Sequence, residues 1–192
     1  MWYVMQVVSG KERNTALLVE RVLPKGILER CFIPMRRRKK KYQGIWQEVT
    51  EKLFPGYVFL ISGEPQLLYD ELKRITALTK LLGSCEEYFT PLSESDVRLL
   101  LKLQDIPNAP EGQENVQKGQ DLCHMWNAGI SKVSIGDDKT IKILSGPLKN
   151  LEGQIKKLNL HKRIAAVETE FMGNRSLIHL GIEIVGEDLE GV

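Results

Sequence analysis

The chain has 192 residues, 42% of them hydrophobic and 27% charged, with a net charge of +2 at pH 7; this composition excludes a disordered chain, and the length allows one domain or two small ones. Its longest apolar runs, four or five residues, exclude a transmembrane helix, which needs about 20, and the first residues lack the pattern of a signal peptide. Three widely separated cysteines without a CxxC pair argue against a disulfide framework and favour a reducing cytoplasm.

The first 104 residues alternate between strand-like and helix-like stretches, separated by turn residues. The predicted elements are, in chain order, a strand at 2–8, a helix at 11–23, a strand at 30–34, a hairpin at 39–51, a strand at 55–61, a helix at 65–75, a strand at 79–82 and a helix through 97–104. For that last helix, Ser93 is the predicted N-cap and Asp96 its partner three residues on. This order predicts an α+β fold with helices packed on a small, mostly antiparallel sheet.

A break in composition separates the two halves of the chain. Residues 105–117 contain two prolines, three acids and no base, and their apolar residues follow no helical or strand period, which indicates a linker. Beyond it, strands are predicted at 132–135, 140–144, 153–158, 164–171 and 176–185. Five short strands separated by turns predict a small all-β barrel. We therefore expect domains at 1–104 and 118–192, the second beginning with an extension that precedes the barrel.

The sequence carries no signature of catalysis. His124, His161 and His179 all follow the linker, and none accompanies a Gly-x-Ser-x-Gly elbow. Cys123 and His124 have no second pair at metal-ligand spacing, and no glycine-rich phosphate loop is present. We predict that the protein is not an enzyme and uses neither a metal nor another cofactor.

A run of six cations is the strongest local signal. It consists of Arg36, Arg37, Arg38, Lys39, Lys40 and Lys41. Tyr42 and Trp46 follow it at the predicted hairpin, where aromatic rings can stack on unpaired bases. Mutual repulsion makes such a run costly without an anionic partner, which favours nucleic acid over a solvated loop. A second, weaker basic set lies around a turn of the predicted barrel and consists of Lys156, Lys157, Lys162 and Arg163. This set is either an RNA contact or an ordinary polar sheet edge.

An aromatic segment opens the predicted strand at 55–61. Phe54 and Tyr57 bracket Pro55 and Gly56. Together with Tyr3, these rings either belong to the core or form an exposed depression for a partner helix. The residues alone do not decide between the two.

Several separated motifs resemble the NusG family of transcription elongation factors. Residues 2–7 with 9–12 resemble the opening of that family, and residues 54–58 resemble its central signature. Residues 78–83 followed by 91–93 look like the end of its N-terminal domain. The KOW motif is matched by Gly146, Pro147, Leu148, Leu151, Gly153, Ile155 and Leu158, and residues 171–175 look like the turn after it. The motifs cover nearly the whole chain in order.

The resemblance implies an N-terminal domain of the NGN type and a C-terminal KOW barrel. It implies that the first domain holds the clamp helices of the largest RNA polymerase subunit through an aromatic depression, here Tyr3, Phe54 and Tyr57, with Pro55 and Gly56 shaping the turn. Such a contact keeps the clamp closed and suppresses pausing. The KOW barrel in this family recruits other proteins or RNA.

Three departures resemble the specialised LoaP-type paralogues: the dense basic block, the extension before the KOW motif and the basic stretch at 161–165. That resemblance implies a cytoplasmic bacterial antiterminator, expected to be monomeric, that recognises a hairpin in nascent leader RNA. Upstream DNA is a second partner for the basic block, and contact with Rho or the ribosome is left open. Two alternatives stand beside this interpretation: a general elongation and termination factor, or a ribosome-associated RNA-binding protein with a KOW barrel.

Overall fold

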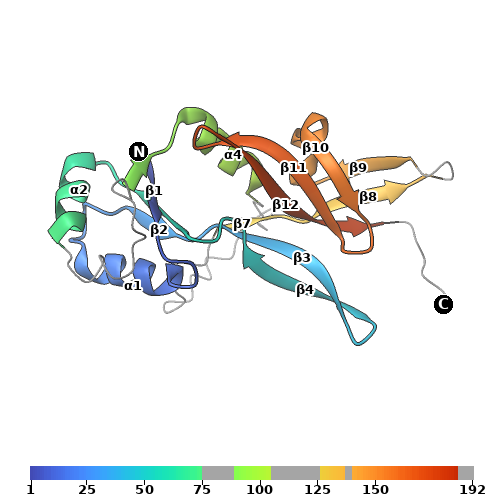
Figure 1. Ribbon diagram of the computed structural model, residues 1–192, viewed down its shortest axis with the longest axis horizontal. Helices are drawn as coiled ribbons and strands as arrows, with labels where there is room; N and C mark the ends of the chain where they lie inside the picture. The colour runs from blue at the N-terminus through green and yellow to red at the C-terminus, as the bar shows by residue number, and fades with distance from the viewer. Residues whose placement is uncertain (75–88, 105–125, 137–139, 186–192) are drawn as a thin grey trace, which may run out of the picture. The chain divides into compact units, whose positions relative to one another are not determined.

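The computed structural model describes residues 1–74, 89–104, 126–136 and 140–185. They form two compact units, each built from separate stretches of the chain (Figure 1). The described parts of unit 1 are residues 1–34, 54–74, 89–97 and 126, and those of unit 2 are residues 35–53, 98–104, 127–136 and 140–185. The predicted linker and the predicted strand at 79–82 lie outside the described residues, and the predicted domain limits stay predictions.

Unit 1 is built on a four-stranded antiparallel sheet in the order β2-β5-β1-β6. Its strands are β1 (Trp2–Gln6), β2 (Arg30–Phe32), β5 (Tyr57–Ile61) and β6 (Phe89–Pro91). The consecutive residues Tyr3, Val4 and Met5 are all buried. Because neighbouring side chains of a strand point to opposite faces, both faces of the central strand are covered. This explains why the sequence shows apolar runs here rather than alternation.

Aromatic rings form the centre of one side of this sheet. Phe32 stacks on Phe59 with a centroid distance of 5.5 Å, and Trp2 meets Phe32 edge-on at 5.5 Å. Phe54 lies 5.9 Å from Phe59, and Trp126 lies 6.3 Å from Phe32. Each such pair contributes about 0.5–1.5 kcal/mol beyond the area it buries, so this cluster is a main source of stability in unit 1.

The predicted helices form as α1 (Glu12–Val22), α2 (Pro65–Arg74) and α4 (Glu94–Leu103). The predicted cap of α4 is confirmed: the Ser93 hydroxyl accepts a hydrogen bond from the Asp96 backbone N–H at 3.1 Å. In return, the Asp96 carboxylate accepts one from the Ser93 backbone N–H at 3.1 Å, which satisfies two groups that a helix end leaves unpaired. Within the described residues, no helix is long and apolar enough to cross a membrane.

Unit 2 contains a five-stranded sheet and a three-stranded sheet. The first has the order β10-β11-β12-β8-β9, and the second the order β4-β3-β7. The strands are β3 (Met35–Tyr42), β4 (Ile45–Lys52), β7 (Asn127–Ala128), β8 (Ser131–Ile135), β9 (Ile141–Ser145), β10 (Ile155–Asn159), β11 (Ile164–Phe171) and β12 (Asn174–Ile184). All pairs in the five-stranded sheet are antiparallel except β12 with β8. The predicted α+β first part and β-rich second part are therefore confirmed, while the KOW assignment stays a prediction.

The third predicted strand of this sheet begins later than expected. The prediction placed its start at Gly153, whereas two short 3₁₀ turns, η2 (Pro147–Asn150) and η3 (Glu152–Gln154), precede β10. The Leu151 N–H donates to the Leu148 carbonyl and the Gln154 N–H to the Leu151 carbonyl, both at 2.9 Å. These bonds span three residues, so the backbone turns here instead of extending.

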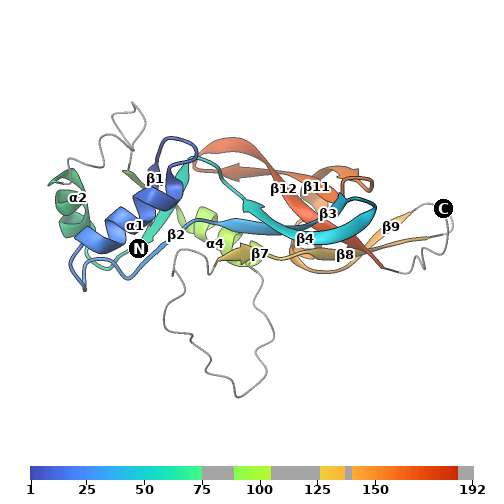
Figure 2. The same ribbon diagram turned by 90° about the horizontal axis from the view of Figure 1, so that it is seen from below.

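The hairpin β3–β4 belongs to unit 2, where β3 runs beside β12 (Figure 2). It is longer than the predicted 39–51 and turns where expected. Gln43 has φ 47° and Gly44 φ 85°. Two residues with positive φ are characteristic of the two-residue hairpin turn whose twist matches that of the flanking strands. The turn fixes the register, so Arg36 lies opposite Glu51 and Lys41 opposite Trp46.

Candidate nucleic-acid interface

The predicted basic block forms most of β3, and carboxylates from neighbouring strands accompany its first four cations. Arg36 and Arg38 each lie 3.0 Å from a different oxygen of Glu51. Two further ion pairs join Arg37 to Glu48 and Lys39 to Glu183, both at 3.3 Å. The chain itself therefore provides part of the negative charge that the sequence led us to expect from a partner.

Glu51 connects the two arginines. Burial alone would raise the pKa of its carboxyl, but the hydrogen bond from Arg36 and the charge of Arg38 outweigh burial and lower the pKa below its ordinary 4.5. Glu51 is thus ionised at neutral pH and fixes both guanidinium groups. The Nε atoms of Arg36 and Arg38 are buried and have no hydrogen-bond partner among the described residues.

The tip of the hairpin holds the remaining cations. Lys40 and Lys41 are exposed and form no ion pair with any carboxylate that the structure describes. The Lys40 ammonium lies 5.1 Å from the centre of the exposed Tyr42 ring. This end of β3 therefore presents positive charge and an accessible aromatic ring together.

The hairpin crosses β12 at Gly181, where the two backbones approach closely. A Cβ at this position would lie 2.8 Å from the Arg38 Cα and would overlap the carbonyl oxygen of Arg37. Only glycine permits such an approach. Contacts hold both sides of the crossing: Arg36 donates a hydrogen bond to the His179 carbonyl at 2.8 Å, and Lys39 pairs with Glu183.

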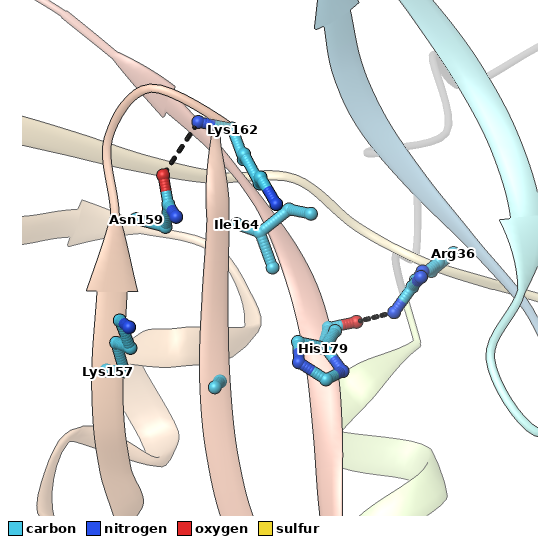
Figure 3. Close-up of a pocket in the computed structure, with 7 residues that line it drawn as sticks. Arg36, Lys157, Asn159, Lys162, Ile164 and His179 are labelled. Atoms are coloured by element: carbon cyan, nitrogen blue, oxygen red, sulfur yellow. Dashed lines mark hydrogen bonds between the residues drawn. The ribbon is translucent and has the colours of Figure 1, made fainter.

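A hollow of about 370 Å³ lies beside this crossing (Figure 3). Two cross-strand rows of the sheet line it: Lys157, Ala166 and His179 form one row, and Asn159 and Ile164 belong to the next. Since cross-strand partners share a face, these side chains lie on the same side of the sheet. Apolar side chains thus form part of the hollow, and polar ones surround them.

Arg36 and Lys162 complete the lining. The Asn159 Oδ1 accepts the Lys162 backbone N–H at 2.9 Å and so shapes the turn between β10 and β11 (Figure 3). Neither Lys157 nor Lys162 forms an ion pair with a described carboxylate. The hollow therefore joins Arg36 of the first predicted basic set to two lysines of the second.

The other two residues of the second set have partners within unit 2. Lys156 lies 3.0 Å from the Glu168 carboxylate. Arg163 is only 8% exposed, and its guanidinium lies 4.9 Å from the centre of the Trp46 ring on β4. Its backbone has φ 52° and accepts the Ile182 N–H at 3.0 Å. Arg163 thus fastens the hairpin to the turn after β10, and one face of Trp46 is occupied.

Sequence reasoning missed the role of His179 in this site, where it expected only a packed or solvated residue. Burial and, after it, the charge of Arg36 lower the pKa of the imidazole below 6.5, so the ring is neutral at pH 7. The available signal was the alternation in β12, where His179 stands between the buried Ile178 and Leu180 and must face the other side.

The predicted aromatic depression is distributed over both faces of the unit 1 sheet. Tyr3 is 4% exposed and pairs with Leu60, whereas Tyr57 points with Phe59 to the opposite face. Burial raises the pKa of the Tyr3 hydroxyl. Phe54 is 8% exposed and packs on Phe59. Both Tyr3 and Phe54 are therefore core residues, while Tyr57 is half-buried.

Two hydrogen bonds hold the turn before β5, and Pro55 is its exposed residue. Gly56 has φ 85°, a conformation that favours glycine. Its N–H donates to the buried Glu12 carboxylate at 2.7 Å, and its carbonyl accepts the Val7 N–H at 2.8 Å. Pro55 and Tyr57 are thus held at the surface on a fixed backbone.

A family model described as "NusG: Transcription termination factor nusG" matches residues 1–101, more than half of the chain. The chain belongs to the NusG family. It is 23% identical to the transcription termination/antitermination protein NusG of Thermus thermophilus, with 93% of this chain and 94% of that protein covered. It is 22% identical to the NusG protein of Bacillus subtilis, with 93% of each covered. A solved structure described as "Domain interaction in Thermotoga maritima NusG" is 21% identical, with a TM-score of 0.47 and 94% and 92% covered.

Family membership bears on the predicted chemistry. NusG proteins are non-enzymatic transcription factors, which confirms that this chain is not an enzyme. Factors of the family interact with RNA polymerase. Neither the LoaP-type assignment nor the residues predicted for RNA and polymerase are tested by the match, and they stay predictions.

Proposed function

We propose that this protein is a cytoplasmic antitermination factor of the LoaP type, which binds the clamp helices of RNA polymerase and is recruited by a hairpin in nascent leader RNA. In this proposal, residues 1–104 provide the polymerase contact, residues 105–117 the linker, and β8–β12 the KOW barrel. The bound factor keeps the clamp closed and suppresses pausing and termination.

One observation carries the RNA part of the proposal. Two basic sets more than 100 residues apart in the chain meet at one hollow, where Arg36 lies with Lys157 and Lys162. Lys40 and Lys41 extend this charge along β3. Cations without carboxylate partners are those that gain most by neutralising phosphates, because no internal ion pair must be broken.

The RNA proposal is tested with a variant in which Lys40, Lys41, Lys157 and Lys162 are changed to Gln. It should bind the leader hairpin more weakly. The plot of the logarithm of the binding constant against the logarithm of the salt concentration should become shallower by roughly 3, since each lost phosphate contact removes about 0.7–0.9 from the slope. The control variant changes Lys102, Lys132, Lys142 and Lys149, all exposed and outside the hollow, to Gln. Equal binding by both variants would show that the RNA site lies elsewhere.

The polymerase contact is proposed at Pro55 and Tyr57, the accessible part of the predicted aromatic site. Tyr57→Ala should reduce co-purification with RNA polymerase without unfolding the protein, because truncation of an aromatic anchor costs about 2–4 kcal/mol of binding. Tyr69→Ala in α2 provides a tyrosine control. Unchanged co-purification of a folded Tyr57→Ala protein would refute this assignment.

A general elongation and termination factor is the second candidate, favoured by the similarity to the termination/antitermination proteins NusG of Thermus thermophilus and Bacillus subtilis. The two candidates differ in their need for a dedicated RNA. Transcription through a terminator with purified polymerase should respond to this protein only when the leader hairpin lies upstream. A similar response on templates with and without the hairpin would favour the general factor.

A further inference from the structure

The hollow beside the hairpin crossing has the size of a small-molecule site rather than of a groove for a helix. Its volume of about 370 Å³ lies at the lower end of the range for ligand pockets, about 300–1,000 Å³. A paired base stays inside its helix and cannot enter such a space, whereas an unstacked base with its phosphate can. The volume of the hollow therefore fits a single unpaired nucleotide, as found in loops and bulges of RNA.

The lining of the hollow combines two apolar side chains with polar ones. Ile164 and Ala166 offer an apolar surface on which a base can lie flat. The neutral imidazole of His179, in the row of Ala166, carries one donor and one acceptor nitrogen. The Asn159 Oδ1 is used by the Lys162 backbone, which leaves the amide donors for a ligand. Such groups match the donors and acceptors at the edge of a base.

Positive charge without an internal partner stands at the same hollow. Lys157 and Lys162 form no ion pair with a described carboxylate, while Arg36 is fixed by Glu51 and by the His179 carbonyl. Lys157 and Lys162 can therefore bind a phosphate, and Arg36, held in place by its own partners, adds a positive charge beside them. A bare phosphate site would need neither the apolar pair nor the imidazole.

The geometry points to a pocket for one unstacked nucleotide of RNA, with its base on Ile164 and Ala166 and its phosphate at Lys157 and Lys162. This inference rests on the proposed function and deepens it, because it specifies which part of the leader hairpin the protein reads: a nucleotide outside the paired stem.

The experiment uses the full chain and two kinds of probe. The first is AMP or UMP compared with inorganic phosphate, followed through the amide signals of the labelled protein. The nucleotides should shift the His179 signals in addition to those near the two lysines, whereas phosphate should shift only the signals near the lysines. The second is a pair of hairpins that are identical except for one unpaired nucleotide, and the hairpin with that nucleotide should bind more tightly.

Two variants alter the proposed base contact without changing the lysines. Ala166→Leu extends a side chain into the hollow, and His179→Ala removes the ring but keeps the backbone carbonyl that Arg36 uses. Each should remove the preference for the unpaired nucleotide, a loss of roughly five- to hundredfold if the base contact resembles other base platforms. Leu177→Ala, on the same face of β12 but outside the lining, is the control. Circular dichroism checks folding.

The outcomes separate the pocket from the proposed function. Equal affinity for nucleotide and phosphate, or unchanged discrimination in both folded variants, would overturn the pocket even if the leader hairpin binds. If the wild type binds AMP in a manner that Ala166→Leu abolishes, but binds no leader hairpin better than a control RNA, the pocket stands and the recruitment by RNA fails.

Discussion

The sheet of unit 1 and the hairpin of unit 2 are stabilised by opposite means. The sheet buries both of its faces, and its centre is a group of aromatic rings around Phe32 and Phe59. The hairpin is held by ion pairs, by the cation–π contact of Arg163 with Trp46 and by a close backbone crossing at Gly181. Burial of apolar area does not depend on charge screening or on the ionisation of side chains, whereas partly exposed charge pairs depend on both.

Residues that suggested a partner site in the sequence have different surroundings in the two regions. In unit 1, aromatic residues that suggested a partner site are largely core, and two neighbours, Pro55 and Tyr57, remain accessible. In unit 2, the charges that suggested a partner site are at the surface, but the chain's own acids accompany four of six cations. In each region the candidate contact is therefore only the accessible part of the predicted motif: Pro55 and Tyr57 in unit 1, and the cations without a described carboxylate partner in unit 2.

The largest effect is expected in the aromatic core. Phe32→Ala should destabilise the protein by about 3–5 kcal/mol, because it removes a buried ring and leaves a cavity between Trp2 and Phe59. Urea unfolding followed by circular dichroism measures the loss. Leu67→Ala in α2, where the side chain is 51% exposed, should change stability by less than about 0.5 kcal/mol. Comparable losses in the two variants would contradict the assigned core.

The next effect is expected at the crossing. Gly181→Ala introduces a Cβ only 2.8 Å from the Arg38 Cα, so the hairpin must move away from β12 at a cost of about 1–3 kcal/mol. Hydrogen exchange of the β3 amides should accelerate. Gly153→Ala is the matched control, since no atom lies within 4 Å of the added Cβ. Slow β3 exchange in a folded Gly181→Ala protein would show that the hairpin does not depend on this contact.

Much of the local structure was predictable from the sequence because it depends on neighbouring residues. The strand at 164–171 agrees with β11 residue for residue, and the cap of α4 follows from the spacing of Ser93 and Asp96. The partnership of Arg36 with Glu51 was also accessible, because a two-residue turn at Gln43 and Gly44 sets the register of the whole hairpin.

The grouping of the hairpin with β12 was not predictable in this way. It depends on Gly181, which lies 143 residues after Arg38 in the chain, and periodicity contains no information about such distant approaches. The same holds for Arg163, which resembles a surface cation in the sequence and packs on Trp46 in the structure. Whether Tyr3 and Phe54 are core or surface likewise depends on which face of the sheet is covered.

A smaller effect, and one that depends on pH, is expected at Glu51. Because its folded pKa lies below 4.5, the carboxylate stabilises the hairpin above that pH, and the contribution is lost as the pH falls through the folded pKa. Glu51→Gln should cost roughly 1 kcal/mol at pH 7 and less at pH 3. Glu48→Gln, which removes a more exposed ion pair, should cost less at pH 7. A cost of Glu51→Gln that does not change with pH would exclude this electrostatic role.

The smallest net effect is expected at Arg163, where two contributions oppose each other. Its left-handed backbone, φ 52°, costs about 1–2 kcal/mol for any residue with a Cβ, while its stacking on Trp46 contributes about 0.5–2 kcal/mol. Arg163→Ala keeps the backbone cost and loses the stacking, so it should destabilise the protein. Arg163→Gly loses the stacking but also relieves the backbone, so it should be nearly neutral.

Gln43 allows the backbone contribution to be measured separately. It is exposed and has φ 47°, so Gln43→Gly relieves a similar backbone cost without removing a cation–π contact. Subtracting its effect from that of Arg163→Gly leaves the worth of the stacking, which should agree with the loss in Arg163→Ala within about 0.5 kcal/mol. If Arg163→Gly destabilises the protein as much as Arg163→Ala, the backbone at this turn carries no strain, and stacking on Trp46 alone holds Arg163 against the hairpin.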